Sequence, residues 1–168
     1  MTERTYLNWP FLEESHRQLA NDFRIWADQK IAPLSDHEPR DDAGLDALAR
    51  ELVKRFAAGG WLQYSVPAPW GGKYPSLDVR ALCLMREILA QYSGMADFSF
   101  VMQGLGSGPI SLFGSEVMRR KYLPDVASGR RIAAFALSEV DSGSDVAAMK
   151  TNARLDGEHY ILNGTKTL

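Results

Sequence analysis

Residues 135–145 read FALSEVDSGSD, and the hydrophobic pattern of the chain changes just before this stretch. Up to about residue 129, apolar residues recur at three- and four-residue spacing, which predicts amphipathic helices. From Arg131 onward short apolar runs alternate with tight turns, and RIAAFAL (131–137) is predicted to be a buried strand. This order predicts an α+β protein in which a helical bundle precedes a β-domain.

The residues that follow the predicted strand have the composition of a turn, with Ser138, Ser142, Gly143 and Ser144 close together. Hydroxyl groups and small residues let backbone N–H groups approach an anion, so this loop could hold a phosphate or the polar edge of a ring. Turns of this composition are common and are mostly only turns. The residues alone therefore leave a binding turn and a plain turn as two open interpretations.

Two segments after the turn alternate in polarity and predict further strands: KTNARL (150–155) and HYIL (159–162). Asp156-Gly157 between them predicts a hairpin, and Asn163-Gly164 predicts a second turn of the same kind. Three strands with an unfinished partner cannot close a core. We therefore expect residues 131–168 to be the incomplete beginning of a β-barrel or sandwich-like domain, and residues 1–130 to form a helical domain.

The helical part carries its own start and stop signals. The first helix is expected to end at Pro33, because the residue before a proline is pushed out of the helical region. The second helix is expected to end at Gly59-Gly60. Ser76 is predicted to cap a third helix, apolar nearly all round, that runs to about Tyr92 and lies in the middle of a bundle. Ser115 is predicted to cap a last helical stretch.

Two features that suggest chemistry are better explained structurally. The series Gly104-x-Gly106-x-Gly108 lacks the spacing and the strand–turn–helix context of a dinucleotide fingerprint, so we expect a tightly turning connection there. Cys83 is the only cysteine and lies among apolar residues, which predicts a buried, unreactive thiol and excludes an internal disulfide.

Composition limits the class of protein further. The chain has 168 residues, a formal net charge of −2 and scattered Lys and Arg, which argues against a nucleic-acid surface. No apolar run is long enough for a membrane span, and the N-terminus lacks the order of a secretory signal, so we expect a cytoplasmic protein. The three histidines are too dispersed to suggest a metal site.

Three ordered segments together resemble the acyl-CoA dehydrogenase family: FGSEVMRRKYLPDVASG, FALSEVDSGSD and DGEHYILNGTK. Family members carry a KYLP…G stretch, a strand that leads into a TEPxAGSD-type turn, and a DGxxYxLNGxKxWIT hairpin. The resemblance runs in register from about Gly114 to Lys166, and the PAPWGG turn (67–72) fits the family more loosely. It implies an N-terminal helical domain and the start of the middle β-domain, with the C-terminal helical domain absent.

The resemblance implies that the turn binds FAD. Ser138 stands where the family has a hydroxyl residue that hydrogen-bonds the pyrimidine edge of the ring, and Gly143-Ser144 would lie by the cofactor and the acyl-CoA entry. Ser144 is thus also a candidate for substrate binding. Phe135, Leu137 and Leu168 complete the expected flavin site, although Leu168 falls where the family usually has a tryptophan.

Ser138 and Val140 depart from the family pattern of this turn, and Glu139 lies between them. Ser138 replaces the usual threonine but keeps the hydroxyl, and Val140 replaces the usual proline, which loosens the turn. Glu139 invites assignment as a catalytic base, but the corresponding glutamate of the family is structural, so no chemistry is assigned to it.

The activity that the resemblance implies is α,β-dehydrogenation of an acyl-CoA or of a carrier-protein-bound acyl thioester, as in fatty acid metabolism. The base of the family, usually a glutamate, belongs to the C-terminal domain, so no catalytic residue is expected in this chain, which should be inactive alone. An electron-transfer flavoprotein would accept the electrons, and the full-length protein would be a homo-oligomer.

Two alternatives belong to other classes. An oxidase or monooxygenase of the same fold would use the reduced flavin with oxygen. A non-catalytic helical interaction module would explain the apolar helices, but it leaves the FALSEVDSGSD and DGEHYILNGTK segments unexplained.

Overall fold

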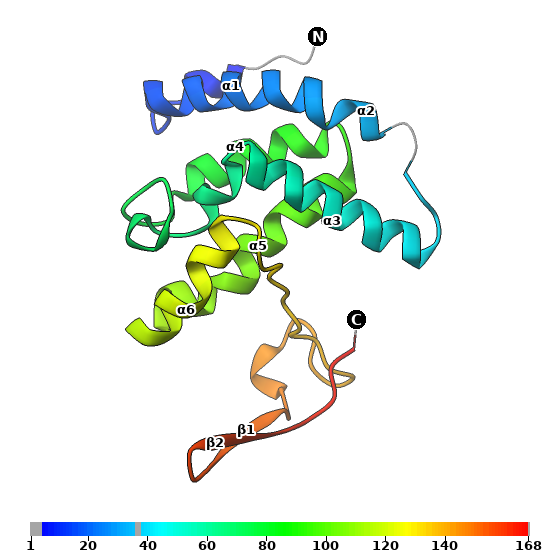
Figure 1. Cartoon of the computed structure of the whole chain (residues 1–168), viewed down its shortest axis with the longest axis vertical. Coiled ribbons are helices and arrows are strands. Elements are labelled where there is room, and N and C mark those ends of the chain that lie inside the picture. Colours follow the sequence, from blue (N-terminus) through cyan, green and yellow to red (C-terminus); the bar gives the residue numbers. More distant parts are fainter. Residues whose placement is uncertain (1–4, 36–37, 168) are drawn as a thin grey trace. The chain divides into compact units, whose positions relative to one another are not determined.

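The computed structural model describes residues 5–35 and 38–167, and the chain forms two compact units, Met1–Ala134 and Phe135–Leu168 (Figure 1). The first unit is helical, and the second holds a small antiparallel sheet of two strands. The predicted α+β fold, a helical bundle followed by the first strands of a β-domain, is confirmed at this level.

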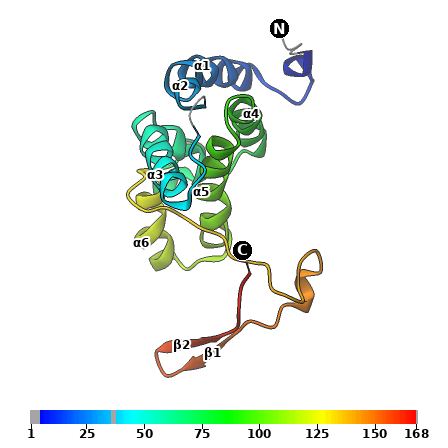
Figure 2. The ribbon, with the colours of Figure 1, turned by 90° about the vertical axis from the view of Figure 1, so that its right-hand side faces the viewer.

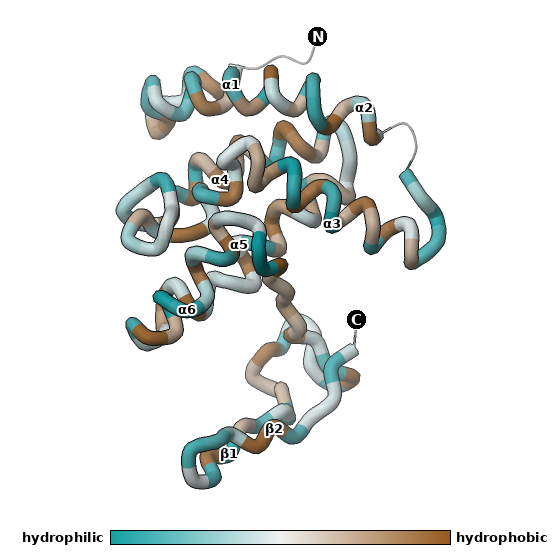
Figure 3. Tube along the Cα trace, in the orientation of Figure 1, coloured by the Kyte–Doolittle hydropathy of each residue, from teal (hydrophilic) through white to brown (hydrophobic). Residues whose placement is uncertain are grey.

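In the described part of the first unit, six α-helices form the bundle: α1 (Glu14–Lys30), α2 (Ala32–Ser35), α3 (Asp42–Ala58), α4 (Val79–Ala90), α5 (Gly94–Phe113) and α6 (Glu116–Ala127). Three short 3-10 helices accompany them: η1 (Thr5–Asn8), η2 (Trp61–Ser65) and η3 (Ala68–Trp70). α5 packs against α3, α4 and α6, and α1 covers α4 (Figure 2). Hydrophobic and hydrophilic residues alternate along α1 and α3, as the sequence spacing predicts (Figure 3).

Aromatic rings fill the centre of this bundle. Phe23, Phe56 and Phe100 come from α1, α3 and α5 and are almost fully buried. The Phe56 and Phe100 rings meet edge to face with their centroids 5.5 Å apart, and Trp26 stacks on Phe23 at 5.4 Å. Burying a phenylalanine side chain stabilises a fold by about 1.5–3 kcal/mol, so these rings hold the three helices together.

A polar clamp joins the beginnings of α1 and α4. The buried His16 accepts a hydrogen bond from the Glu13 backbone N–H at Nδ1 (3.1 Å), and its Nε2 lies 3.1 Å from Oδ2 of Asp78. Because Nδ1 is the acceptor, Nε2 carries the hydrogen and donates a hydrogen bond to the Asp78 carboxylate. Arg80 donates two further side-chain hydrogen bonds to Asp78, and these, followed by the His16 bond, hold the pKa of Asp78 well below its usual range.

Three details of the helical part differ from the sequence prediction. Asp78 caps α4, accepting from the Arg80 N–H at 2.9 Å, so the predicted cap at Ser76 is wrong. Pro33 lies inside α2 and does not end α1, which stops at Lys30. Cys83 is exposed, because it lies on the outward side of α4, and the prediction of a buried thiol is wrong.

The glycine series is also different from the expectation of a turning connection. α5 continues through Gly104, Gly106, Gly108 and Pro109 without a break. Gly106 is required for another reason: a Cβ there would lie 2.6 Å from the backbone oxygen of Ala134. The glycine therefore allows a close approach of two backbone segments and makes no turn.

The second unit contains η4 (Val146–Ala148) and a hairpin of β1 (Asn152–Asp156) and β2 (His159–Asn163). The register runs from Asn152 opposite Asn163 to Asp156 opposite His159, so the loop consists of Gly157 and Glu158. Gly157 has a φ of 59°, which glycine adopts without strain. The hairpin was predicted correctly, but its two loop residues lie one position later than Asp156-Gly157.

Two other predictions for this unit are wrong. Residues 131–137 form no strand, because no segment within 5–35 or 38–167 pairs with them, and a strand needs a hydrogen-bonded neighbour. No turn follows β2 at Asn163-Gly164. Gly164 instead packs against Thr151, whose Oγ1 would lie 2.0 Å from an added Cβ.

Candidate functional site

The turn after residue 137 is closed by a pair of backbone hydrogen bonds. The Glu139 N–H donates to the Ser142 oxygen at 2.9 Å, and the Ser142 N–H donates back to Glu139 at 3.2 Å. Val140 and Asp141 form the exposed tip between them. Ser142 is buried, and its hydroxyl donates to the Asp145 oxygen at 3.0 Å. These bonds give the serine-rich segment a defined shape even though the proline that would stiffen it is replaced by Val140.

The Glu139 carboxylate ties three parts of the unit together. It accepts from the backbone N–H groups of Lys150 at 2.7 Å and of Thr151 at 3.0 Å, and from the Lys166 ammonium at 2.9 Å. Lys166 also donates to the Leu137 oxygen at 2.9 Å. Only 8% of the Glu139 side chain is exposed. Its contacts therefore anchor the turn to the segments before β1 and after β2.

These contacts also determine the charge of Glu139. The neighbouring Thr151 side chain, followed by Lys166 and the Lys150 N–H, lowers the pKa of Glu139 to about 2. A general base works best when its pKa lies near the operating pH. Glu139 is thus charged at neutral pH and poorly suited to act as a base, and the expectation that it carries no chemistry stays a prediction.

The groups that remain free lie on either side of the closed turn. Ser138 precedes Glu139 and Gly143 follows Ser142, so the bridge brings Ser138 and the Gly143-Ser144 pair to the same end of the turn. Ser138 and Ser144 are exposed, and within the described residues their hydroxyls have no hydrogen-bond partner. The N–H groups of Gly143 and Ser144 are likewise unpaired in the described part of the chain.

Space accompanies these free donors. Gly143 is exposed, and apart from the glycine and its two chain neighbours no atom of the described residues lies within 4 Å of the position that a Cβ would take there. Two hydroxyls, two free N–H groups and this open space suit a flat ring with polar atoms on its edge. Flavin binding at this turn, which the resemblance implies, stays a prediction.

The other predicted site residues are Phe135, Leu137 and Leu168. Phe135 and Leu137 are half-buried and lead into the turn, where the Leu137 oxygen is held by Lys166. Leu168 lies outside the described residues. Sequence reasoning missed the role of Lys166, although it belongs to the quoted DGEHYILNGTK segment. The only signal for it was that Lys166 is the one charged residue in the stretch 160–168.

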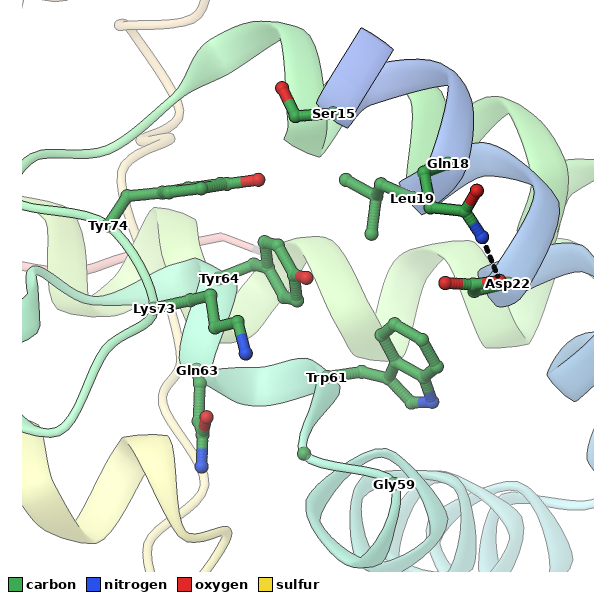
Figure 4. Close-up of a pocket in the computed structure, with 11 residues that line it drawn as sticks. Ser15, Gln18, Leu19, Asp22, Gly59, Trp61, Gln63, Tyr64, Lys73 and Tyr74 are labelled. Atoms are coloured by element: carbon green, nitrogen blue, oxygen red, sulfur yellow. Dashed lines mark hydrogen bonds between the residues drawn. The ribbon is translucent and has the colours of Figure 1, made fainter.

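A hollow of about 500 Å³ lies in the helical unit, between α1 and the segment that contains η2 (Figure 4). The rings of Trp61, Tyr64 and Tyr74 line it, and Gln18 on α1 donates to Asp22 at 2.7 Å. Burial is the main cause that raises the pKa of Tyr64 and of Tyr74. None of the residues that the sequence singles out for binding lines this hollow.

Two further classes of site are not found in the described residues. No group of three or more His, Cys, Asp or Glu side chains there could hold a metal ion. Among those same residues, no helix combines the length and the apolar character needed to cross a membrane.

The chain is similar to a family model, to curated proteins and to solved structures. The model of the family described as "Acyl-CoA dehydrogenase, N-terminal domain" matches residues 13–130. The chain is 35% identical to a 3-(aryl)acrylate reductase of Clostridium sporogenes over 161 residues, covering 94% of this chain. It is 33% identical to a probable acyl-CoA dehydrogenase of Mycobacterium tuberculosis over 158 residues, covering 92% of this chain.

Solved structures give a consistent result. An acyl-CoA dehydrogenase from Bacillus anthracis complexed with FAD superposes with a TM-score of 0.76 at 35% identity, covering 93% of this chain and 26% of that one. A glutaryl-coenzyme A dehydrogenase in its glutaryl-CoA complex gives a TM-score of 0.73 at 29% identity, covering 93% of this chain and 39% of that one. The present chain spans 40% and 38% of the two curated relatives named above.

Proposed function

The chain belongs to the acyl-CoA dehydrogenase family, and on that premise we propose that its protein is an FAD-dependent oxidoreductase that dehydrogenates an acyl thioester between the α- and β-carbons. The observation that carries this proposal is the closed turn at residues 138–144, which leaves the Ser138 and Ser144 hydroxyls and the Gly143 and Ser144 N–H groups exposed and without a partner among the described residues. In this proposal Met1–Ala134 corresponds to the N-terminal helical domain and the second unit to the beginning of the middle β-domain.

FAD would supply the redox chemistry, by accepting a hydride from the substrate β-carbon. The chain's own contribution is to bind and orient. The Ser138 hydroxyl would hydrogen-bond the polar edge of the flavin ring, and Gly143 would leave room for it. Phe135 and Leu137 would supply apolar contacts beside the ring, together with Leu168. Ser144 would stand nearer the acyl-CoA and hydrogen-bond the substrate side.

Glu139 has a supporting role in this proposal. Its charge is committed to Lys166 and to two backbone N–H groups, so it would keep the turn in shape while Ser138 binds. The base that removes the α-proton is proposed to lie outside these 168 residues, which would be inactive by themselves. An electron-transfer flavoprotein would be the electron acceptor of a cytoplasmic homo-oligomer.

A second candidate is suggested by the relative named 3-(aryl)acrylate reductase. Reduction of an acrylate double bond is the reverse of dehydrogenation of the saturated acid, because both transfer the same two hydrogens. The same turn would then hold the flavin while the substrate binds in its unsaturated form. Assays with a saturated and an unsaturated acyl substrate, each with a suitable electron acceptor or donor, distinguish the two directions.

The proposal is tested by flavin content. Ser138→Ala should weaken FAD binding about two- to tenfold, because one hydrogen bond contributes roughly 0.5–1.5 kcal/mol. Ser144→Ala should act more on substrate affinity, and Ser76→Ala, at another exposed serine, serves as the matched control. Absorbance after desalting measures retained flavin in the 168-residue chain and in any longer protein that contains it.

Three results would count against the proposal or redirect it. Equal flavin content, spectrum and kinetics in all three variants would make the turn only a turn. Absence of flavin from every protein that contains the chain would favour a non-catalytic interaction module. Oxygen consumption without an added electron acceptor would favour an oxidase or monooxygenase of the same fold.

A further inference from the structure

One side of α5 receives the backbone of residues 133 and 134, the last residues of the helical unit. The Ala133 N–H donates to Oε1 of Gln103 at 2.9 Å. One turn along the helix, the backbone of Ala134 lies so close to Gly106 that a Cβ there would be 2.6 Å from its oxygen and 2.8 Å from its nitrogen. We call the pair Gln103 and Gly106 the α5 seat.

The side chain of Gln103 holds the backbone of Ala133 in one orientation. The residue is 1% exposed, and its Nε2 donates to the Ser99 oxygen at 2.9 Å while Oε1 accepts from Ala133. Both ends of the amide are therefore used, and flipping the group would break both bonds. Ser107 donates to the Gln103 backbone oxygen at 2.6 Å from the next turn. A buried amide with both ends paired is a strong constraint on position.

Gly106 leaves room for the backbone of Ala134, whereas Gln103 accepts a hydrogen bond from Ala133. The atoms that an added methyl would meet all belong to the backbone of Ala134, which cannot rotate away like a side chain. At Gly108 an added methyl would meet nothing within 4 Å. The close approach is thus confined to the one glycine that faces the outgoing segment.

A third contact fixes the same segment just before the seat. The Arg131 N–H donates to the Asp125 backbone oxygen at 3.1 Å, and its guanidinium donates to the Asp125 carboxylate at 2.9 Å. Residues 131, 133 and 134 are therefore held in succession by α6 and α5. Ser138, the first free donor of the turn, follows Ala133 by five residues, and at about 3.4 Å per residue this length reaches at most about 17 Å.

We propose that Gln103 is a positioning residue for the flavin-binding turn: with Gly106 it fixes the point from which the chain enters that turn. The inference rests on the function proposed above. Gln103 touches neither cofactor nor substrate in this account. It limits the freedom of the segment that carries Ser138, which lowers the entropy that the turn must lose when a ring binds.

The test compares two replacements of similar size. Gln103→Met removes both hydrogen bonds, whereas Gln103→Glu keeps an acceptor for Ala133 and, when protonated, also a donor for Ser99. Burial raises the pKa of a carboxyl group, so the glutamate should substitute for the glutamine at low pH and less well at high pH. Gln63→Met, at an exposed glutamine, is the matched control.

Hydrogen exchange and flavin affinity are the two measurements. In Gln103→Met, the peptide that covers residues 131–137 should exchange about tenfold faster than in the unmodified protein. The FAD dissociation constant should rise about two- to tenfold, the effect of losing the one hydrogen bond that holds Ala133. Peptides from α1 and α3 should keep their protection, which shows that the variant is folded. Gln103→Glu should recover the unmodified exchange rate at pH about 5.5 and lose it at pH about 8, with rates compared at each pH.

The outcomes separate this inference from the function on which it rests. Unchanged exchange in Gln103→Met would overturn the seat itself. Faster exchange with an unchanged flavin spectrum and affinity would overturn the positioning role while leaving the proposed function intact. If the unmodified protein takes up no FAD, the proposed function and the positioning role both fail, and the exchange data still decide whether the seat holds residues 131–137.

Discussion

Replacing Gly106 by alanine should destabilise the helical unit, although the same substitution at Gly104, two residues earlier in α5, should stabilise it. Both glycines lie inside one continuous helix, so the gain in helix propensity is the same for both. They differ in what an added methyl group would meet. The pair therefore separates the intrinsic preference of the helix for alanine from the effect of the Ala134 backbone.

The magnitudes follow from these distances. Alanine is favoured over glycine in a helix interior by roughly 0.5–1 kcal/mol. At Gly104 the new methyl would lie 3.8 Å from Ser65, an ordinary contact, so the free energy of unfolding should rise by about that amount. At Gly106 the methyl would lie 2.6 Å from a backbone oxygen. Forced overpacking costs about 1–3 kcal/mol, which after the gain in helix propensity leaves a net loss of up to about 2.5 kcal/mol.

Urea unfolding, followed by far-ultraviolet circular dichroism, measures both free energies. The Gly104→Ala midpoint should lie above that of the unmodified chain and the Gly106→Ala midpoint below it, at equal slopes. If Gly106→Ala unfolds at the same urea concentration as Gly104→Ala, the close approach of Ala134 to α5 is wrong, and the α5 seat loses half of its basis.

Three further predictions concern other groups. His16→Leu removes a buried hydrogen-bond partner of Asp78 and should lower the free energy of unfolding by about 1–3 kcal/mol in the same urea assay; an unchanged midpoint would contradict the clamp. The pKa of Glu139 is lowered from 4.5 to about 2, so its contribution to the turn is complete above pH 4.5 and is lost as the pH falls toward 2. NMR signals of the turn, followed over a pH titration, should report the loss of this contribution. In Lys166→Met the loss should occur at a higher pH. Loss at the same pH in both proteins would mean that Lys166 does not stabilise the charge of Glu139. Cys83 should react with an aromatic disulfide without denaturant, and a thiol that reacts only in urea would restore the prediction of a buried cysteine.

The helical part shows which signals a sequence carries by itself. Apolar spacing predicted α1 and α3 as amphipathic helices, because the buried face of a helix repeats every three to four residues whatever it packs against. The prediction of a third helix that is apolar nearly all round is wrong for α4. This helix buries one face, which carries Leu84, Met85 and Ile88, and it exposes Val79, Cys83 and Glu87 on the other. Ser115 was correctly predicted as the cap of α6, where its hydroxyl accepts from the Met118 N–H. Signals of this kind act within one turn of helix, so neighbouring residues determine them.

Other positions depend on residues far away in the sequence. Ser76 and Asp78 can both cap a helix, and the chain uses Asp78, whose carboxylate also meets His16. Gly106 has the composition of a turn, but its role is set by Ala134. Cys83 sits in an apolar sequence, yet α4 turns it toward the outside. In each case the local pattern was ambiguous, and a tertiary contact or the direction of a helix face decided.

The candidate site divides along the same line. Its donors, Ser138 and the Gly143-Ser144 pair, were predicted from residues that lie in one short segment. The anchor of that segment could not be found this way, because Lys166 reaches the turn from beyond the hairpin. For Glu139, the neighbouring residues in the sequence and the contacts from distant residues suggest different roles. Its position next to Ser138 suggests a base, but the ammonium and the backbone N–H groups around it lower its pKa to about 2. A carboxylate with that pKa accepts a proton poorly at neutral pH, so a mechanism that removes an α-proton requires a different residue, and Glu139 is better explained as the charge that keeps the turn closed.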